Sequence, residues 1–296
     1  MEDTTKHKPV LLNEVVSFLA PQEGESYLDL TAGYGGHADK ILEVTRNYKG
    51  AVLVDRDLNA VEYLRAKYRE VKPEIVHDDF YNAALRLVES GKKFDMILAD
   101  FGVSSPQLDQ RERGFSIALS SRLDMRMDKR QELDAWRVVN KWSERDLIEI
   151  FVEYGEEREV RARMLAREIV HSRPIETTGE LAEIIKRKSG YGSKHPATQI
   201  FQAIRIAVND ELGQIERVLP LVTKLLAPGG RAGLISFHSL EDRLVKEYLT
   251  EASGRGIESD LRVLTKKPII AGKSELVNNP RARSAKLRVA ERLPES

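Results

Sequence analysis

Three glycines and a carboxylate stand at spacings that matter for ligand binding. Gly33, Gly35 and Gly36 fall within four residues, directly after a short, mostly apolar run at 27–30. Glycines are needed where a ligand must approach the main chain, because a Cβ atom would block the contact. Asp55 follows Gly35 by 20 residues, a distance at which an acidic side chain commonly accepts hydrogen bonds from ribose hydroxyls. These residues predict a cofactor that contains a nucleoside.

The glycine pattern does not by itself choose the cofactor. Gly33-x-Gly35-x-x-Ala38 fits the dinucleotide fingerprint in its G-x-G-x-x-A form. It also fits the glycine loop of methyltransferases that use S-adenosylmethionine (SAM). Asp29, just before the loop, favours SAM, because dehydrogenases usually carry an apolar residue at that place. A tight strand–helix turn without a ligand is the third interpretation, and the spacing of Asp55 argues against it.

A second group of polar residues follows another predicted strand. Residues 94–99 form a mostly apolar run, and residues 100–107 then supply the carboxylate of Asp100, a glycine, two hydroxyls and the amide of Gln107. In open α/β sheets ligands bind at the carboxyl ends of the strands, so this group and the glycine loop are expected to face one pocket. A simple turn is the alternative interpretation, because Asp, Gly, Ser and Pro all favour turns.

Two more residues at strand ends are open to a functional or a structural interpretation. Phe80 follows a predicted strand at 73–77 and could pack against a flat ring, although an ordinary core position explains it equally well. His238 follows a predicted strand at 231–236 and could act as a general base, although a structural hydrogen bond explains it equally well. Ser239, with Asp242 three residues later, is expected to cap the next helix.

Strands and helices are predicted to alternate at both ends of the chain but not in its middle. Strands are expected at 27–30, 51–54, 73–77, 94–99, 231–236, 261–264 and 285–289. Helices dominate between 108 and 198, at 133–142, 144–154, 156–172 and 179–189, and a long helical stretch is expected at 198–226. The sequence thus predicts an α/β domain in two pieces, 1–108 and 199–296, with an inserted α-helical domain at 109–198.

Composition excludes several classes of protein. Lys plus Arg and Asp plus Glu both number 47, so no overall field indicates a nucleic-acid partner. The chain has no cysteine, which rules out disulfides and Cys-ligated metal sites, and no other metal motif is visible. The N-terminus lacks the pattern of a signal peptide, and no stretch approaches the ~18 apolar residues of a membrane span. We therefore expect a soluble, cytoplasmic protein.

Local charge is less even than the total. Residues 261–296 hold nine Lys and Arg but three Asp and Glu, and residues 279–286 form a compact basic stretch. Clustered Arg and Lys neutralise nucleic-acid phosphates, so the stretch predicts RNA contact, with a solvated tail as the alternative. The arginines of one insert helix are instead expected to form a solvated, salt-bridged face. They are Arg158, Arg161, Arg163 and Arg167.

Several stretches, in order along nearly the whole chain, resemble one family, the bacterial 16S rRNA cytosine-N4 methyltransferases of the MraW/RsmH type. The matching stretches are His7-x-Pro9-Val10-Leu11-Leu12, Asp29-x-Thr31-x-Gly33-x-Gly35-Gly36-His37, Asp100-x-Gly102-Val103-Ser104-Ser105-Pro106-Gln107-Leu108, Arg113-Gly114-Phe115-Ser116, Leu123-Asp124-Met125-Arg126-Met127, Tyr154-Gly155-Glu156-Glu157, Phe201-Gln202-Ala203-Ile204-Arg205, Ser236-Phe237-His238-Ser239-Leu240-Glu241-Asp242-Arg243 and Asn279-Pro280-Arg281-Ala282-Arg283-Ser284. The chain departs from the family pattern at two places. Phe101 stands where leucine is more usual, and Ile117-Ala118-Leu119 stands where the family frequently has a Phe-containing sequence.

The resemblance implies a Rossmann-like class I SAM-dependent methyltransferase sheet with an inserted helical domain that recognises the substrate. It implies SAM as the methyl donor and, as the acceptor, the N4 amine of a cytidine in the decoding centre (P site) of 16S rRNA, within the small (30S) subunit. It also implies the residues that contact SAM, and Asp100 is our candidate for the chemical step as well. The implied SAM contacts are Gly35, Gly36, His37, Asp55, Phe80, Asp100 and Gln107.

Three alternatives stay open at this point. The chain could methylate another acceptor, it could be an NAD-type dehydrogenase, or it could be a nucleotide-binding regulatory protein without catalysis. Asp29 and the Asp100–Gln107 group argue against a dehydrogenase. Asp100 could also bind SAM without taking part in the chemistry. The sequence leaves the oligomeric state open, a homodimer included.

Overall fold

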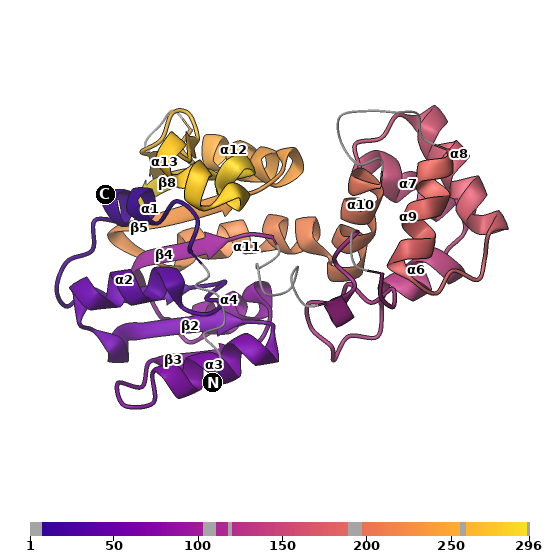
Figure 1. Cartoon of the computed structure of the whole chain (residues 1–296). Helices are drawn as coiled ribbons and strands as arrows, with labels where there is room; N and C mark the ends of the chain where they lie inside the picture. Colours follow the sequence, from indigo (N-terminus) through magenta and orange to yellow (C-terminus); the bar gives the residue numbers. More distant parts are fainter. Residues whose placement is uncertain (1–7, 103–110, 118–119, 189–196, 255–258, 295–296) are drawn as a thin grey trace. The chain divides into compact units, whose positions relative to one another are not determined.

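A computed structural model describes residues 8–102, 111–117, 120–188, 197–254 and 259–294 (Figure 1). The chain divides into two compact units. The first, which we call the sheet unit, combines Met1–Gly102 with Leu212–Ser296, and the second, the helical unit, is Val103–Glu211. Each unit has its own hydrophobic core.

The sheet unit contains eight strands with helices between them. Its strands are β1 (Tyr27–Asp29), β2 (Ala51–Asp55), β3 (Glu74–His77), β4 (Phe94–Asp100), β5 (Leu226–Ser236), β6 (Leu261–Val263), β7 (Ile269–Ile270) and β8 (Lys286–Arg292). Its helices are α1 (Leu12–Leu19), α2 (Gly36–Thr45), α3 (Leu58–Lys67), α4 (Phe80–Glu89), α11 (Glu211–Leu225), α12 (Ser239–Ala252) and α13 (Lys273–Asn278), with short 3-10 turns η1 (Tyr48–Gly50) and η3 (Pro280–Ser284). β7 and α13 were not predicted from the sequence.

The strand order separates this sheet from the usual dinucleotide-binding fold. The order is β3-β2-β1-β4-β5-β8-β6, and β7 pairs with β8. β1 to β5 are parallel, whereas β8 runs antiparallel to β5 and to β6. The doubly wound dinucleotide fold places six parallel strands in the order 3-2-1-4-5-6. The antiparallel β8 between β5 and β6 therefore argues against a dehydrogenase.

Alternating side chains of the strands fill two layers of core. Leu28 of β1 packs with α4, α11 and α12 on one face of the sheet, and its neighbour Tyr27 packs with α1, α2 and α3 on the other. Successive side chains of a strand point to opposite faces, so a strand covered on both sides is apolar throughout. The continuous run Ala51–Val54 of β2, buried at every position, shows this directly.

In its described residues, the helical unit packs five helices and the segment that precedes them around one core. The helices are α6 (Ala135–Lys141), α7 (Glu144–Glu153), α8 (Glu159–His171), α9 (Thr178–Arg187) and α10 (Thr198–Asn209), and a 3-10 turn η2 (Arg111–Arg113) comes before them. The predicted capping box of Ser143 and Asp146 starts α7. Three of the four arginines on the predicted salt-bridged face form ion pairs, confirming it for those residues. The pairs are Arg161–Glu157, Arg163–Glu159 and Arg167–Glu144.

The long helical stretch predicted at 198–226 is confirmed, but it is divided into two helices because the chain turns at Asp210. Asp210 has a φ of 50°, in the left-handed region, and it separates α10 from α11. Asn209 before it bonds Met125 O through Nδ2 and accepts Met127 N–H through Oδ1, both at 2.8 Å. Arg205 then holds Glu211 across the turn by two 2.9 Å contacts. These partners lie up to 84 residues away, so helical periodicity could not reveal the break.

None of the helices in the described ranges is long and apolar enough to cross a membrane.

Candidate active site

Three carboxylates stand at the ends of three neighbouring strands. Asp29, Asp55 and Asp100 are the last residues of β1, β2 and β4, and β1 lies between the other two strands. The parallel direction of these strands brings the three residues to one edge of the sheet, where open α/β folds bind ligands. The convergence that the sequence predicted is present for the glycine loop and Asp100, whereas residues 103–107 of the second group lie outside the described residues.

Asp55 is tied to the glycine loop. Its Oδ2 accepts the N–H of Gly33 at 2.7 Å, and its Oδ1 accepts the N–H of Asp57 at 2.8 Å. Burial raises the pKa of Asp55 to about 6. Gly33 has a φ of 53°, and a Cβ atom at this position would meet only Thr31 O, at 3.9 Å. The loop is therefore open at Gly33, and Asp55 is oriented with lone pairs left for ligand hydroxyls.

Asp29 supports the loop from beneath. Its side chain is 2% exposed and accepts Tyr27 Oη–H at 2.8 Å and Thr31 N–H at 3.1 Å. Burial raises the pKa of Asp29 to about 7, although both hydrogen bonds act in the opposite direction. Thr31 in turn accepts the N–H of Asp100 through Oγ1 at 2.6 Å. Asp29 thus links the first loop to the end of β4.

Asp100 is the carboxylate with unused capacity. Its buried Oδ1 has no hydrogen-bond partner among the residues described. Burial, then the charges of Asp29 and Glu241, raise the pKa of Asp100 well above its ordinary value. Buried polar atoms in folded proteins are nearly always bonded, so an orphan at a strand end marks a place where a ligand group can bind.

Phe80 begins α4 beside this edge of the sheet and is 9% exposed. Its ring packs against that of Phe101, with centroids 5.6 Å apart and the planes tilted by 59°. Phe101, the residue that departs from the family pattern, thereby supplies an aromatic neighbour to Phe80. The two rings form an apolar wall next to Asp100.

The start of α2 is formed by Gly35, Gly36 and His37. At each of these positions the side chain, or the place where a Cβ atom would be, lies against other residues of the protein. A Cβ atom on Gly35 would lie 3.0 Å from Leu64, and one on Gly36 would lie 3.2 Å from three ring carbons of Pro9. His37 is 7% exposed, and its Nε2 is 2.9 Å from Val10 O. The Gly36 and His37 positions contact the N-terminal segment and the Gly35 position faces α3, which leaves the main-chain N–H groups of the first helical turn as the part suited to a ligand.

The end of β5 brings a fourth strand to the site. Asp100 pairs with Ile235, and a Cβ atom on Gly102, whose φ is 104°, would lie 3.2 Å from the ring of Phe237. The residue that caps α12 is His238, not Ser239 as predicted. His238 Nδ1 accepts the N–H of Glu241, whose carboxylate bonds back to the main chain in a capping box. The imidazole satisfies that N–H from the extended residue ahead of the helix, so Ser239 becomes the first helical residue.

The basic C-terminal stretch lies at the same edge. Lys286, the first residue of β8, pairs with Ser236, the last residue of β5. η3, which carries Arg281 and Arg283, directly precedes it, and Arg283 is exposed. The antiparallel pairing thus places the basic stretch beside the carboxyl ends of β4 and β5.

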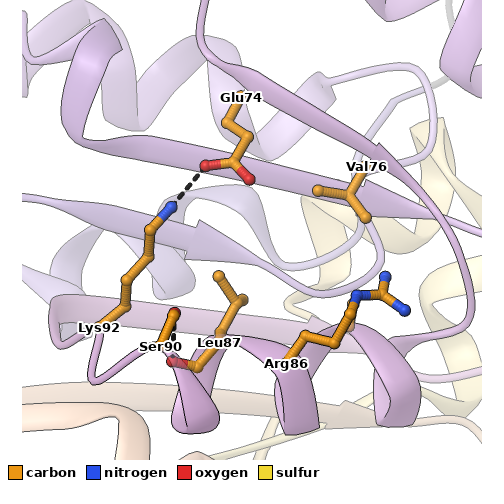
Figure 2. A pocket seen from close by; sticks show the side chains of 7 residues that line it. Glu74, Val76, Arg86, Leu87, Ser90 and Lys92 are labelled. Atoms are coloured by element: carbon orange, nitrogen blue, oxygen red, sulfur yellow. Dashed lines mark hydrogen bonds and ion pairs between the residues drawn. The ribbon is translucent and has the colours of Figure 1, made fainter.

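A separate hollow of about 220 Å³ lies between β3 and α4 (Figure 2). Its lining includes Glu74, which begins β3, and Ser90, which follows α4. Lys92 and Glu74 form an ion pair of 2.5 Å beside it. Because β3 runs from Glu74 toward the ligand-binding edge and α4 runs back, this hollow lies at the opposite end of the sheet and is no part of the site.

The predicted site residues that the structure describes gather at the expected edge, whereas Gln107 lies outside the described residues. Two contributors were missed as individuals: Thr31, which joins two loops, and Glu241, which binds the turn after β5. The sequence does contain a signal for Glu241. His238 is a polar residue followed three positions later by Glu241, which is the spacing of a capping box.

Known proteins are similar to this chain over nearly its whole length. The model of the MraW methylase family matches residues 4–293. A protein of Synechocystis named Ribosomal RNA small subunit methyltransferase H is 46% identical, covering 97% of this chain and 93% of its own. A protein of the same name from Trichormus variabilis is 48% identical, and the match covers 99% of this chain and 94% of that protein. An rRNA methylase structure from Streptococcus thermophilus covers 97% and 98% at 8% identity with a TM-score of 0.46, a likeness too weak to bear on function. With its family match spanning nearly every residue, the chain belongs to the MraW methylase family.

Proposed function

We propose that this enzyme transfers the methyl group of SAM to the N4 amine of one cytidine in the decoding centre (P site) of 16S rRNA. The coarser activity, SAM-dependent methylation of small-subunit rRNA, is that of the family to which the chain belongs. The observation that carries the finer proposal is the buried Oδ1 of Asp100 at the ligand-binding edge, which has no partner in the part of the chain that the structure describes. An exocyclic amine offers N–H donors that fit such an oxygen.

The residues present fit SAM. Asp55 has lone pairs for the ribose hydroxyls, and the main-chain N–H groups at the start of α2, from Gly36 and His37, suit a negatively charged group such as a carboxylate. Phe80 offers an apolar ring to the adenine. We propose that these residues, with Gly35, Asp100 and Gln107, hold the cofactor. SAM, when bound, supplies an electrophilic methyl group.

Asp100 is suited to the acceptor side of the reaction. The lone pair of a cytosine amine is delocalised into the ring, so attack requires the nitrogen to become pyramidal and to gain positive charge. A carboxylate oxygen beside the N–H favours that geometry and accepts the proton as charge develops. The raised pKa of Asp100 makes it a better proton acceptor than an ordinary carboxylate. Burial also excludes water from the step.

Asp100→Asn tests this role. The amide keeps the size of the side chain but cannot accept the proton, so we expect SAM affinity within about twofold and a kcat lowered by about 100-fold or more. Binding is measured by calorimetry and turnover by labelled methyl transfer. An equal loss of SAM affinity and of turnover would contradict the chemical role and leave Asp100 as a cofactor ligand.

The basic stretch after α13 is our candidate for RNA binding. Arg281 and Arg283 lie beside the strand ends that carry the site, and positive side chains that neutralise phosphates make binding salt-dependent. A nucleotide that reaches the pocket must first leave its stack, at a cost of a few kcal/mol, and contacts to the flanking backbone offset that cost. The helical domain at 109–198 is our second candidate for holding the flanking RNA.

Replacing both Arg281 and Arg283 by Ala tests the first candidate. We expect weaker binding of small subunits and a logarithmic salt slope lower by about 1 to 2, with SAM affinity unchanged. The matched control replaces Arg65 and Arg69, two exposed arginines at the far end of α3, by Ala. Equal effects of the two double variants would show a general charge effect and contradict a specific RNA contact.

We also propose that the substrate is the small ribosomal subunit and that the enzyme acts in the cytoplasm. The support for both is the family and the relatives named for the small-subunit RNA. Methylation of assembled subunits but not of the same RNA stripped of protein would identify the particle as the substrate.

A further inference from the structure

Glu241 is wholly buried in the first turn of α12, with an exposed fraction of 0%. One of its oxygens, Oε2, accepts the N–H groups of Phe237 at 2.7 Å and His238 at 3.3 Å. Those bonds complete the helix cap. The second oxygen, Oε1, takes no part in them and lies 3.1 Å from Nε2 of His238. Capping alone therefore does not explain why this buried position carries a charge.

The same oxygen faces the end of β4. A Cβ atom on Gly102 would lie 3.8 Å from Glu241 Oε1, and Gly102 is two residues after Asp100. The register agrees, because Asp100 pairs with Ile235, two residues before Phe237. Glu241 is also one of the two carboxylates whose charge acts on Asp100, the other being Asp29. Two buried acidic groups thus lie together at the site.

His238 lies beside that oxygen. Its Nδ1 accepts the N–H of Glu241 at 3.5 Å, which requires a lone pair on Nδ1 and leaves Nε2 as the nitrogen that carries a proton. Nε2 is 3.1 Å from Oε1, although the two atoms are not aligned as a hydrogen bond. A polarised N–H group at that distance stabilises a negative charge on the oxygen. Asp242, the next acidic residue, is instead bonded to Arg288 at 2.7 Å and to Lys286 at 3.1 Å. Its charge is already paired.

We propose that Glu241 is a positioning residue for methyl transfer, whose charge beside Asp100 makes that carboxylate a stronger proton acceptor for the amine, with His238 stabilising the charge. This inference rests on the role proposed for Asp100. As the N–C bond forms and the S–C bond breaks, the amine nitrogen becomes positive, and one of its protons passes to Asp100. A nearby negative charge that persists through the step favours this proton transfer.

Glu241→Gln tests the proposal, because an amide oxygen can keep the cap while the charge is lost. Removing the charge makes Asp100 a weaker base that stays ionised to lower pH. We expect the acid limb of the kcat–pH profile to move down by about half a pH unit or more, and the maximal kcat to fall about tenfold. SAM affinity should stay within about twofold. An unmoved acid limb overturns the proposal, because a purely structural cap would not shift it.

His238→Asn gives a second test. Asn is a strong helix cap, so α12 is retained while the imidazole beside Oε1 is lost. The charge on Glu241 is then less stabilised and acts on Asp100 less, so we expect the acid limb to move to lower pH, as with Glu241→Gln. This variant also keeps the proposal testable if Glu241→Gln does not fold. A limb that stays in place or moves to higher pH contradicts the proposal.

Asp242→Asn is the matched control, since it removes the same charge one residue away on the same helix. We expect its acid limb to coincide with that of the parent enzyme, and an equal shift would contradict a specific effect of Glu241. Asp100→Asn separates the two proposals. If Asp100→Asn keeps its turnover and its acid limb, the proposed role of Asp100 is wrong. If Asp100→Asn loses turnover while the acid limb of Glu241→Gln coincides with that of the parent enzyme, only the inference about Glu241 is wrong.

Discussion

At the scale of single residues, the site is built from acidic side chains with different tasks. Asp29 is enclosed and accepts two hydrogen bonds, Asp55 is held by two main-chain N–H groups, and Asp100 has a buried oxygen with no partner among the described residues. The three have similar chemistry, so their environments decide their roles. Asp29 positions the loop, Asp55 suits ribose, and Asp100 suits the acceptor amine.

Asp29 should leave a signature in the pH dependence of stability. Its folded pKa of about 7 lies above the unfolded value near 3.8, so the native state binds the proton more tightly. The stability it supports is present at low pH and is lost as pH rises through 7. Between pH 5 and pH 8 this loss amounts to roughly 3 kcal/mol of the free energy of unfolding.

The check is Asp29→Asn, measured by urea unfolding without cofactor at both pH values. Relative to the parent protein, the variant should gain roughly 3 kcal/mol on going from pH 5 to pH 8, because its side chain cannot ionise. A difference between the two proteins that is the same at pH 5 and pH 8 would show that Asp29 does not titrate in this range.

At the scale of elements, the start of α2 joins the glycine loop to the N-terminal segment. Gly36 lies against Pro9, and His37 lies against the carbonyl of Val10. Leu11 N–H in turn donates to Glu275 of α13 at 2.8 Å. The first and last parts of the sheet unit therefore meet at the helix that would hold the cofactor, which explains on packing grounds why glycine suits position 36.

Gly36→Ala should destabilise the protein through Pro9 alone, because Gly36 is not among the residues with positive φ. We expect the free energy of unfolding to fall by about 1 to 2 kcal/mol. In a Pro9→Ala background the same change should cost less, since Cγ and Cδ are gone and only Cβ remains. Chemical denaturation of the four proteins measures this cycle. Equal effects of Gly36→Ala in both backgrounds would contradict the packing account.

At the scale of the whole molecule, local patterns predicted most of the sheet, because apolar runs that end in Asp also become strands that end in Asp. β1, β2 and β4 follow this rule. What the sequence could not show depended on distant partners. The turn at Asp210 is stabilised by bonds from Asn209 to Met125 and Met127, and the two-residue strand β7 exists by pairing with β8.

The site, like the fold, has features that the sequence predicted and features that depended on distant parts of the chain. The positions of Asp55 and Asp100 followed from spacing and strand ends, whereas the part of each residue that faces the ligand did not. At Gly36 and His37 the side-chain positions contact the N-terminal segment, and this contact comes from a part of the chain about 27 residues earlier. The role of Glu241 required knowing that β5 lies next to β4.

The central claim is tested most directly by methyl transfer from labelled SAM to purified small ribosomal subunits that lack this modification, followed by nucleoside analysis of the RNA. We predict that the label appears as N4-methylcytidine at a single decoding-centre site, and that Asp100→Asn transfers little of it. Label on a different atom or nucleoside, or no transfer by an enzyme that binds SAM, would contradict the account.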